Sequence, residues 1–465
     1  MIMKDVNIYN TLTRKVETFK PIKDKEVSIY SCGPTVYHFV HLGNLRAYVF
    51  ADTLRRTLVY TGYKVKHVMN ITDVGHLVGD GNIGEDKLEK GAKREGKTAY
   101  EIAEHYTQSF MNDLVLLNIP IDKYIFPRAT DHIKEQIELI KKLEEKGYTY
   151  KTTDGIYFDT SKFSHYGDLA KLDIDGLKSG ARVEENKEKR NITDFALWKF
   201  SPTDSKRQME WDSPWGVGFP GWHIECSAMS QKYLGNHFDI HTGGIDLIPV
   251  HHTNEIAQSE SANGEKYVNY FMHVSFLNDK TGKMSKSNED FLRLENLISF
   301  NYPALAYKYF LLTAHYRSEV TFSYEGMDGA SSAFNKLVNW CKENKTDGGV
   351  VNVEYKNKFD EAIFNDLNTS QALAIVWGLI ADKIISNEDK YKTIISFDEV
   401  LGLGLLEMKK EEVIIPDEVK LLLEERKSAR ENKDFKLSDE LRDKIKEQGF
   451  VVKDGKQGQE VEKSD

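Results

Sequence analysis

The chain has 465 residues, of which 40% are apolar, 11% aromatic and 29% charged, and its formal net charge at neutral pH is −10. This length and composition predict a globular protein with about three structural units and argue against a disordered chain. The acidic balance argues against a protein that coats nucleic acid indiscriminately, but it leaves room for a local basic surface that reads a structured RNA.

Cysteine usage and apolar runs indicate the compartment. Only Cys32, Cys226 and Cys341 occur, and their odd number and long spacings argue against a disulfide framework and for reduced thiols that serve as ligands or core residues. The longest apolar run, residues 372–381, is about half of the roughly 20 residues that cross a bilayer, and the first ten residues lack the apolar stretch of a signal peptide. We therefore expect a cytoplasmic protein without membrane contact.

The first predicted elements form a strand–helix–strand unit. The segment VSIYSC, residues 27–32, predicts a short buried strand that is followed by a Gly-Pro turn. Apolar periodicity from about residue 44 to 60 predicts a helix, and KVKHVMNIT, residues 64–72, predicts the next strand. Such a unit implies a parallel sheet that binds ligands at the carboxyl ends of its strands.

The same pattern returns after a long interval. Residues 237–244 predict a strand and loop, residues 251–262 a helix, and residues 267–277 a further strand. Between the two patterns, helical periodicity near 98–118 and 131–147 precedes YKTTDGIYFDT, whose alternation and Asp-Gly turn predict a hairpin. We therefore expect a parallel sheet that is interrupted by an inserted module.

Beyond residue 302 the strand signals fade, and the rest of the chain predicts helices. Periodic segments lie near 303–316, 328–345, 356–388 and 413–449. The predicted fold class is α/β: a Rossmann-like catalytic domain with an insertion, an α-helical C-terminal region and a small C-terminal module. The expected divisions are the first half of the sheet domain, the inserted module, its second half, a loop and connecting region, a helical bundle, and the last module, at residues 1–120, 121–215, 216–280, 281–325, 326–410 and 411–465.

A first candidate site lies in GPTVYHFVHLGNLR, residues 33–46, which places His41, Gly43 and Asn44 where a strand hands over to a helix. The start of a helix presents free N–H groups and the positive end of its dipole, so it can hold a phosphate group, and glycine lets the backbone approach closely. Taken alone, such a turn is more often a capped loop than a nucleotide site.

A second candidate site is DKTGKMSKS, residues 279–287, which contains Lys283 and Lys286. Two lysines on a glycine-rich loop can neutralise the charge that develops on a triphosphate, although a lysine-rich surface loop is the ordinary alternative. Together with the upstream His-x-Gly-Asn turn, KMSKS resembles the paired ATP motifs of class I aminoacyl-tRNA synthetases.

A third set of residues could hold a metal. Cys32 ends the first strand, Cys226 lies in GWHIECSAMS, and HHTNE spaces His251 and Glu255 four residues apart on one helix face. Two thiolates, one imidazole and one carboxylate make a plausible tetrahedral zinc shell. Spacing alone does not establish it, since a strand-end cysteine is usually a core residue and a His/Glu pair is usually a surface pair.

The surrounding motifs strengthen the metal hypothesis. In their order, CGPTVY, HLGN, GWHIECSAMS, GGIDLIPVHHTNEIAQSE and GKMSKS resemble the cysteinyl-tRNA synthetase family, and the resemblance implies that Cys32, Cys226, His251 and Glu255 bind one zinc ion. It extends to the segment from ARENKDF to GKQG, which resembles the anticodon-recognising module of that family. Departures include Thr242, which stands where a glycine of an HGGG run is usual, and Thr253, which stands where glutamate is common.

The resemblance implies an activity. Zinc would select cysteine over serine by binding its sulfur, which a pocket that judges only shape could not do well. The cysteine carboxylate would attack the α-phosphate of Mg²⁺-ATP, and the adenylate would pass to the 3′-terminal ribose of tRNA-Cys. The implied catalytic residues are His41, Asn44, Lys283 and Lys286, and His41, Gly43, Asn44 and Lys286 would contact the nucleotide. Gly33, Thr35 and Trp222 would line the amino-acid pocket, although Trp222 fits an ordinary core position nearly as well. We expect a monomer.

Two other functions remain open at this point. A cysteine ligase of the mycothiol type would use the same zinc and adenylation chemistry on an amino sugar, but it typically lacks the anticodon-binding end. A non-catalytic zinc-containing RNA-binding protein could keep the fold, but it would be expected to lose KMSKS or the histidine of HLGN, and the chain retains both.

Overall fold

The computed structural model describes residues 5–74, 87–172, 188–202, 206–279, 282–283, 292–407, 417–455 and 458–463. The chain divides into two compact units, Met1–Leu406 and Glu407–Asp465. None of the helices in the described ranges combines the length and the apolar composition that a bilayer crossing demands.

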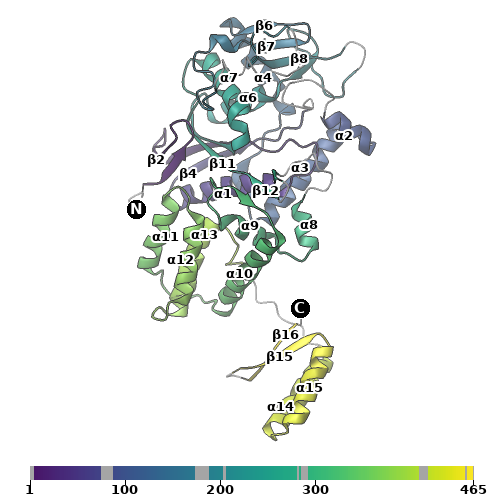
Figure 1. The fold of residues 1–465 in the computed structure, drawn as a ribbon, viewed down its shortest axis with the longest axis vertical. Helices are drawn as coiled ribbons and strands as arrows, with labels where there is room; N and C mark the ends of the chain where they lie inside the picture. Colours follow the sequence, from purple (N-terminus) through teal and green to yellow (C-terminus); the bar gives the residue numbers. More distant parts are fainter. Residues whose placement is uncertain are drawn as a thin grey trace. The chain divides into compact units, whose positions relative to one another are not determined.

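A five-stranded parallel sheet forms the centre of the first unit (Figure 1). Its strand order is β11-β10-β3-β4-β5, and every neighbouring pair is parallel. The strands are β3 (Glu26–Ser31), β4 (Lys64–Met69), β5 (Tyr124–Ile125), β10 (Phe238–Gly244) and β11 (Val268–Val274). Helix α1 (Leu42–Tyr60) connects β3 to β4, and α7 (Thr253–Asn263) lies between β10 and β11. The predicted pair of strand–helix–strand units and the α/β fold class are confirmed.

The strand order reverses between β3 and β10. From β3 the chain passes to β4 on one side, and from β10 it passes to β11 on the other side. In open parallel sheets a crevice opens at such a point, outside the carboxyl ends of the two strands. Cys32, His41 and Asn44 follow β3, and His251 and Glu255 follow β10, so this crevice is where the candidate residues of both halves can meet.

The inserted segment builds an antiparallel sheet in the order β6-β7-β8-β9. Its strands are β6 (Thr149–Lys151), β7 (Gly155–Phe158), β8 (Phe195–Phe200) and β9 (Gly218–Pro220), and the predicted hairpin is β6–β7. The helices of this part of the chain are α2 (Lys87–Glu95), α3 (Ala99–Leu116) and α4 (Ile133–Glu145). Helix α6 (Trp222–Leu234) follows β9 and returns the chain to the parallel sheet.

The inserted sheet shares its hydrophobic core with α6 and α7. Trp198 of β8 and Leu143 of α4 are buried in one cluster with Ile224 of α6 and Ala257 of α7. Figure 1 shows α4, α6 and α7 beside β6–β8. The helices that carry Cys226 and Glu255 are therefore supported by the insertion as well as by the parallel sheet.

The last part of the first unit is mainly helical. Its helices are α8 (Leu294–Ser299), α9 (Ala304–Leu312), α10 (Tyr324–Glu343), α11 (Val353–Phe364), α12 (Thr369–Ala381) and α13 (Asn387–Leu401). The single periodic segment predicted over 356–388 is two helices, because Asp366 and Leu367 adopt positive φ angles of 57° and 55° and interrupt the helical backbone. Helix α13 was not predicted.

Short strands occur where none was predicted. Strand β12 (Leu277–Asp279) pairs with β13 (Gly282–Lys283) and with β14 (Val320–Thr321), and β1 (Asn7–Asn10) pairs with β2 (Lys15–Thr18). These strands have two to four residues each, which is too short for side-chain alternation to be recognised in the sequence.

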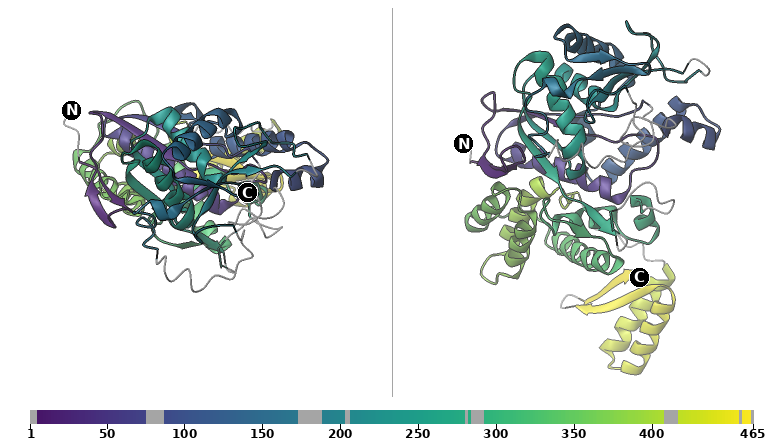
Figure 2. Two further views of the ribbon diagram at one scale, coloured as in Figure 1. Left: turned by 90° about the horizontal axis from the view of Figure 1, so that it is seen from above. Right: turned by 45° about the horizontal axis from the view of Figure 1, so that its top comes forward.

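The second unit contains two helices and a hairpin. Helices α14 (Asp417–Glu431) and α15 (Phe435–Glu447) pack together, and α15 contacts β15 (Phe450–Gly455), which pairs with β16 (Gly458–Lys463), as the yellow segments of Figure 2 show. Val419, Ile445, Phe450 and Val452 form its core. The periodicity at 413–449 predicted the helices, but the hairpin was missed.

A buried ion cluster joins α1 to α9. The Asp52 carboxylate, which is fully buried, lies 2.9 Å from Arg55 Nη2, 2.6 Å from Arg56 Nε and 3.3 Å from Lys308 Nζ. Burial alone would raise the pKa of Asp52, but Lys308, Arg56 and Arg55 outweigh it and lower the pKa. Burial lowers the pKa of Lys308 to about 8. Three cations thus share a single carboxylate, which leaves an excess of positive charge in the cluster.

The excess of positive charge predicts which of two substitutions destabilises the protein more. Asp52→Asn removes the carboxylate that three cations share and should lower the free energy of unfolding by about 3–5 kcal/mol. Lys308→Met removes one cation and leaves Asp52 paired with both arginines, so it should cost less than half as much. Urea unfolding followed by circular dichroism measures both variants, and a loss from Lys308→Met equal to that from Asp52→Asn would contradict the assignment.

Candidate metal centre and nucleotide site

Cys32 lies at the point where the strand order reverses. Its backbone N–H donates to Thr242 O of β10 at 3.1 Å, which extends the pairing of β3 with β10 by one residue. The next backbone N–H, of Gly33, donates to Asn70 Oδ1 at 2.9 Å. A Cβ atom on Gly33 would lie 1.7 Å from Asn70 O, so only glycine lets the chain turn away here. The Cys32 side chain meets the β10–β11 connection, where its Sγ lies 3.3 Å from His252 Nε2.

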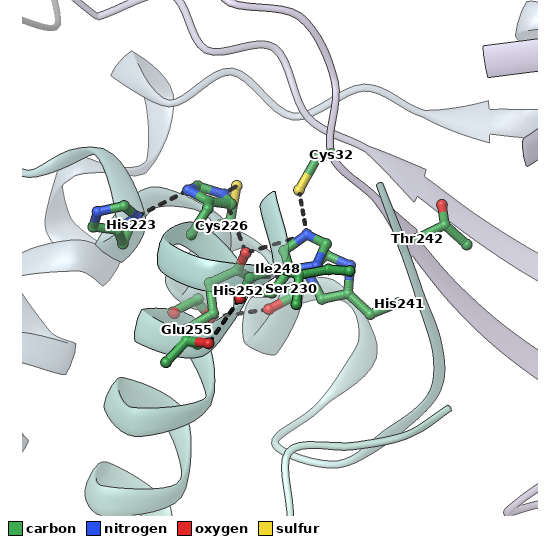
Figure 3. A network of polar contacts seen from close by, with 12 residues as sticks. Cys32, His223, Cys226, Ser230, His241, Thr242, Ile248, His252 and Glu255 are labelled. Carbon is green, nitrogen blue, oxygen red and sulfur yellow. Dashed lines mark hydrogen bonds and ion pairs between the residues drawn. The ribbon is translucent and has the colours of Figure 1, made fainter. Parts of the chain in front are cut away.

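Three further segments converge on Cys32. Cys226 lies on α6, His251 lies on a single π-helical turn, η5 (Ile248–His252), and Glu255 lies in the first turn of α7. His251 Nε2 is 3.4 Å from Cys226 Sγ and 3.1 Å from Glu255 Oε1. The ligand atoms of Cys32, Cys226, His251 and Glu255 all lie within 4.8 Å of one another. Figure 3 shows Cys32, Cys226 and Glu255 around a common centre. The structure thus brings together the four residues that the sequence proposed.

The arrangement fits a cation better than it fits a set of hydrogen bonds. Glu255 Oε1 is buried and accepts no hydrogen bond from the residues that the structure describes, although His251 Nε2 lies 3.1 Å from it. Tetrahedral zinc binds thiolate, imidazole and carboxylate donors at about 2.0–2.3 Å, so that four donors around one ion are a few ångströms apart. Two sulfur donors favour a soft or borderline ion over magnesium or calcium. The residues present fit zinc, although the identity of the ion remains a prediction.

A second overlapping group could also hold an ion. It consists of Cys32, His241, His252 and Glu255, whose ligand atoms also lie within 4.8 Å of one another. His252 Nε2 is 3.3 Å from Cys32 Sγ and 4.0 Å from Glu255 Oε1. The two groups share Cys32 and Glu255. The group with Cys226 supplies two sulfurs, and two sulfurs match structural and selective zinc sites better than one.

A layer of buried groups surrounds Glu255 and orients it. Glu255 Oε2 lies 2.9 Å from His241 Nε2 and accepts a hydrogen bond of 2.9 Å from the Tyr267 hydroxyl. Burial alone would raise the pKa of Glu255, but His241 and His251, together with these contacts, outweigh it and lower the pKa. Glu255 is therefore an anion in this dry pocket.

Histidines continue this layer away from the centre. His251 Nδ1 lies 2.9 Å from His223 Nδ1, and His252 Nδ1 lies 2.7 Å from His273 Nε2. His273 Nδ1 in turn lies 2.7 Å from the hydroxyl of Thr11. Burial lowers the pKa of both His252 and His273 well below the usual value. Neutral imidazoles can bind a metal or fix the orientation of a ligand that does.

The sequence analysis missed this layer of histidines. His223, His241, His252, His273 and Tyr267 were not proposed as functional residues, yet each of the four histidines lies in or beside a segment that was named. His241 lies in the middle of β10 and His273 is the last but one residue of the neighbouring β11, and histidines on adjacent buried strands are the signal that could have identified them.

The thiols complete the electrostatic balance of the pocket. Burial raises the pKa of the Cys32 thiol well above its usual value, and Cys226 and Glu255 raise it further. Without a cation the pocket therefore holds neutral thiols beside one carboxylate. Because thiolate rather than thiol is the metal ligand, a bound divalent ion would displace protons from these sulfurs.

The HLGN turn forms the start of α1. His41 is the N-cap: its Nδ1 accepts a hydrogen bond from Asn44 N at 3.1 Å, and Asn44 Oδ1 accepts from His41 N at 3.2 Å. Both residues thus serve as caps, which was the ordinary alternative. The capping also orients the ring, since a neutral His41 that accepts at Nδ1 carries its proton on Nε2. A Cβ on Gly43 would lie 3.0 Å from this ring, so glycine gives the ring its room.

The remaining predicted residues lie in different surroundings, and one of them is outside the described residues. Lys283 is in β13, where it pairs with Asn278 of β12, and Lys286 lies outside the described residues. Trp222 is the first residue of α6, and its ring is 4.6 Å from the ring of His251. Thr35 forms an isolated bridge with Thr72 beside the end of β4. Trp222 therefore lies against the metal cluster, whereas Thr35 lies on the side of the loop that faces β4.

Comparison with known proteins first identifies the class of fold. The family model of the class I (C) tRNA synthetase catalytic domain matches residues 18–332. The structure also resembles a methionyl-tRNA synthetase of Mycobacterium tuberculosis, solved in complex with methionyl-adenylate, with a TM-score of 0.57 at 16% identity over 82% of this chain and 90% of that one. The fold is therefore that of a class I aminoacyl-tRNA synthetase.

Sequence relatives define the family more narrowly. The model of the cysteinyl-tRNA ligase anticodon binding domain matches residues 414–461. The chain is 51% identical to cysteine–tRNA ligase 1 of Burkholderia lata over 98% of its own length and 96% of that protein, and 45% identical to cysteine–tRNA ligase of Treponema denticola over 97% and 98%. The chain belongs to the cysteine–tRNA ligase family.

The contact between Tyr267 and Glu255 predicts an effect on metal binding. Tyr267→Phe removes the hydroxyl that donates to Glu255 and should weaken zinc binding about 10-fold, as losses in the shell around a metal site typically do. Competition with a chromophoric chelator measures the affinity. Tyr391→Phe is the matched control, because it also removes a buried hydroxyl, one without a hydrogen-bond partner in the described part of the chain. Equal zinc affinity of wild type and Tyr267→Phe would contradict the prediction.

Proposed function

We propose that the chain is a cysteine–tRNA ligase that binds one zinc ion through Cys32, Cys226, His251 and Glu255, forms cysteinyl-adenylate from cysteine and Mg²⁺-ATP, and transfers cysteine to the 3′-terminal ribose of tRNA-Cys. The observation that carries the proposal is the convergence of these four side chains from β3, α6 and the β10–β11 connection, next to the helix start that bears HLGN. The family membership of the chain supports the same activity.

The zinc ion, when bound, would accept the sulfur of cysteine as a further ligand and so distinguish it from the harder oxygen of serine. The residues of the chain supply the rest of the pocket. Cys226 and Glu255 are buried and fixed by their elements, Trp222 packs against His251, and Gly33 allows the backbone to pass close to Asn70 directly after Cys32. Because a shape-based pocket discriminates poorly between such similar substrates, selectivity would come from the donor set.

Adenylate formation requires no protein nucleophile, since the substrate carboxylate attacks the α-phosphate. The positive end of the α1 dipole would face the triphosphate. His41 would donate from Nε2, and Gly43 and Asn44 would keep the backbone close to the nucleotide. Lys283 and Lys286 would neutralise the charge that develops on the phosphates. Catalysis would therefore come from positioning and charge stabilisation.

The C-terminal unit favours tRNA over an amino sugar as the acceptor. Residues 414–461 match an anticodon binding domain, and a ligase that acts on an amino sugar has no use for one. The presence of both His41 and the KMSKS lysines favours a catalyst over a protein that only binds RNA. The insertion would contact the acceptor end of the tRNA.

Cysteine-dependent exchange of pyrophosphate into ATP, followed by charging of a tRNA-Cys transcript, tests the proposal. We expect both activities. Exchange without charging, combined with transfer of cysteine to an amino sugar, would identify the other ligase, and zinc-loaded protein that supports no exchange would remove both catalytic functions.

The donor set predicts the result of one substitution. Cys226→Ser replaces a sulfur ligand with a poorer oxygen donor and should lower both the bound zinc and the affinity for cysteine. Elemental analysis and calorimetric titration with cysteine measure the two effects. Cys341→Ser is the matched control, because Cys341 is a buried cysteine of α10 outside the cluster. One zinc per chain in Cys226→Ser would contradict the assignment.

The KMSKS motif predicts a kinetic separation. Lys286→Ala should slow adenylate formation about 100-fold or more while cysteine affinity changes little, because the lysine would act on charge that develops in the transition state. Single-turnover kinetics and cysteine titration measure the two quantities, with Lys134→Ala, an exposed lysine of α4, as control. Equal losses of rate and affinity would argue against this role.

A further inference from the structure

Arg46 is a buried cation whose guanidinium is surrounded by backbone carbonyl oxygens. It lies on α1, two residues after Asn44, and is 3% exposed. In the described ranges no carboxylate lies within ion-pair distance of its guanidinium, which instead donates only to backbone carbonyl oxygens. Burial lowers the pKa of Arg46 to about 10, so it remains protonated at neutral pH. A buried charge is costly unless its donors are satisfied, so the arrangement of these acceptors calls for an explanation.

The acceptors belong to two separate segments. Arg46 Nη1 donates to Ser275 O at 2.9 Å and to Phe276 O, just before β12. Arg46 Nη2 donates to Ser318 O at 2.5 Å and lies within 3.3–3.4 Å of the carbonyls of His315 and Tyr316, just before β14. The planar guanidinium with its five donors is suited to span two segments in this way.

The two segments directly precede β12 and β14, and β12 leads to the KMSKS motif. Ser275 N donates to Tyr316 O at 2.9 Å, and Val320 N donates to Phe276 O at 3.1 Å. Beyond these contacts, β12 pairs with β14 on one side and with β13, which contains Lys283, on the other. Arg46 thus attaches the base of this small sheet to the helix whose first turn carries His41 and Asn44.

The far end of the same segment is also attached to α1. Leu42 N, at the first residue of α1, donates to Leu292 O at 2.9 Å. The guanidinium carbon of Arg293 lies 4.1 Å from the centre of the Phe39 ring, two residues before His41. The segment that contains KMSKS is therefore attached to α1 or to the turn before it at both of its ends, through residues 275–276 and through residues 292–293. Both attachments lie within about one turn of the HLGN residues.

We propose that Arg46 is a positioning residue for adenylate formation: it fixes β12 and β14, and through β12 the strand β13 that contains Lys283, relative to the HLGN turn, so that the KMSKS and HLGN motifs address one triphosphate. The inference rests on the proposed function. Arg46 does not contact the substrate in this mechanism. A purely structural role would stabilise the fold without a specific effect on the adenylation step, and the two roles are separable.

Arg46→Lys keeps the charge, but its single ammonium cannot reach both segments. We expect the rate of adenylate formation to fall 10-fold or more, while zinc content and cysteine affinity stay within twofold of wild type. Arg317→Lys is the matched control: it lies in the same turn, pairs with Asp366 and not with α1, and should leave the rate unchanged. Phe39→Leu, which removes the contact with Arg293 at the other attachment, should give a smaller loss of the same kind and serves if Arg46→Lys does not fold.

A double-mutant cycle with Lys286→Ala tests whether Arg46 acts through KMSKS. If it does, Arg46→Lys should add less than a twofold loss in the Lys286→Ala background. Multiplied losses, a parallel fall in cysteine affinity, or an unchanged rate in Arg46→Lys would overturn the proposal.

Hydrogen exchange provides a readout that does not depend on the proposed activity. In Arg46→Lys, amides of residues 275–279 and 315–321 should exchange at least 10-fold faster, whereas those of α6 and α7 should not change. If the wild type does not exchange pyrophosphate into ATP but Arg46→Lys shows this pattern of amide exchange, the proposed function is refuted while the attachment by Arg46 stands. Unchanged amide exchange would refute the attachment.

Discussion

The catalytic unit depends on holding the buried groups Glu255 and Cys226 together with the half-buried Cys32. Glu255 and Cys226 are almost fully buried, and a negative charge in such a place needs a cation or a dense set of donors. The fold meets this requirement by placing the cluster at the carboxyl ends of β3 and β10, where backbone polar groups are already paired within the sheet and side chains from several connections can converge. The topology of the sheet thus provides the position at which a metal would bind.

The orientation of the cluster relies on residues that touch no ligand. Glu255 is held by Tyr267 and His241, and His251 is held by His223. The π-helical turn at Ile248–His252 places two successive histidines where each can face a different part of the cluster, and such turns are common at functional sites. These contacts fix the orientation of Glu255 and His251 before any metal binds, which is how a buried site can be both rigid and selective.

Sequence reasoning predicted local patterns well and long-range supports poorly. The strands before Cys32 and after α1 were predicted because apolar runs, a Gly-Pro turn and helical periodicity all agree there. The metal set depended on a family resemblance, because Cys32 and Cys226 lie on distant segments and the spacing of His251 and Glu255 alone is more often that of a surface pair. The break near Asp366 was missed because a positive φ there is stabilised by contacts of its side chain with Tyr9 N, Tyr316 and Arg317. Likewise, β12 and β14 are defined by each other and by Arg46, so neither has a signature of its own in the sequence.

The common core of the insertion, α6 and α7 has a consequence for any attempt to shorten the chain. Deleting the β6–β9 sheet would leave Ile224 and Ala257 facing water on the two helices that present Cys226 and Glu255. A reduced catalytic domain would therefore lose apolar burial at the place where its metal ligands need rigidity. The inserted sheet and the cluster are inseparable, so a minimal version of this enzyme must retain the insertion even if it never meets a tRNA.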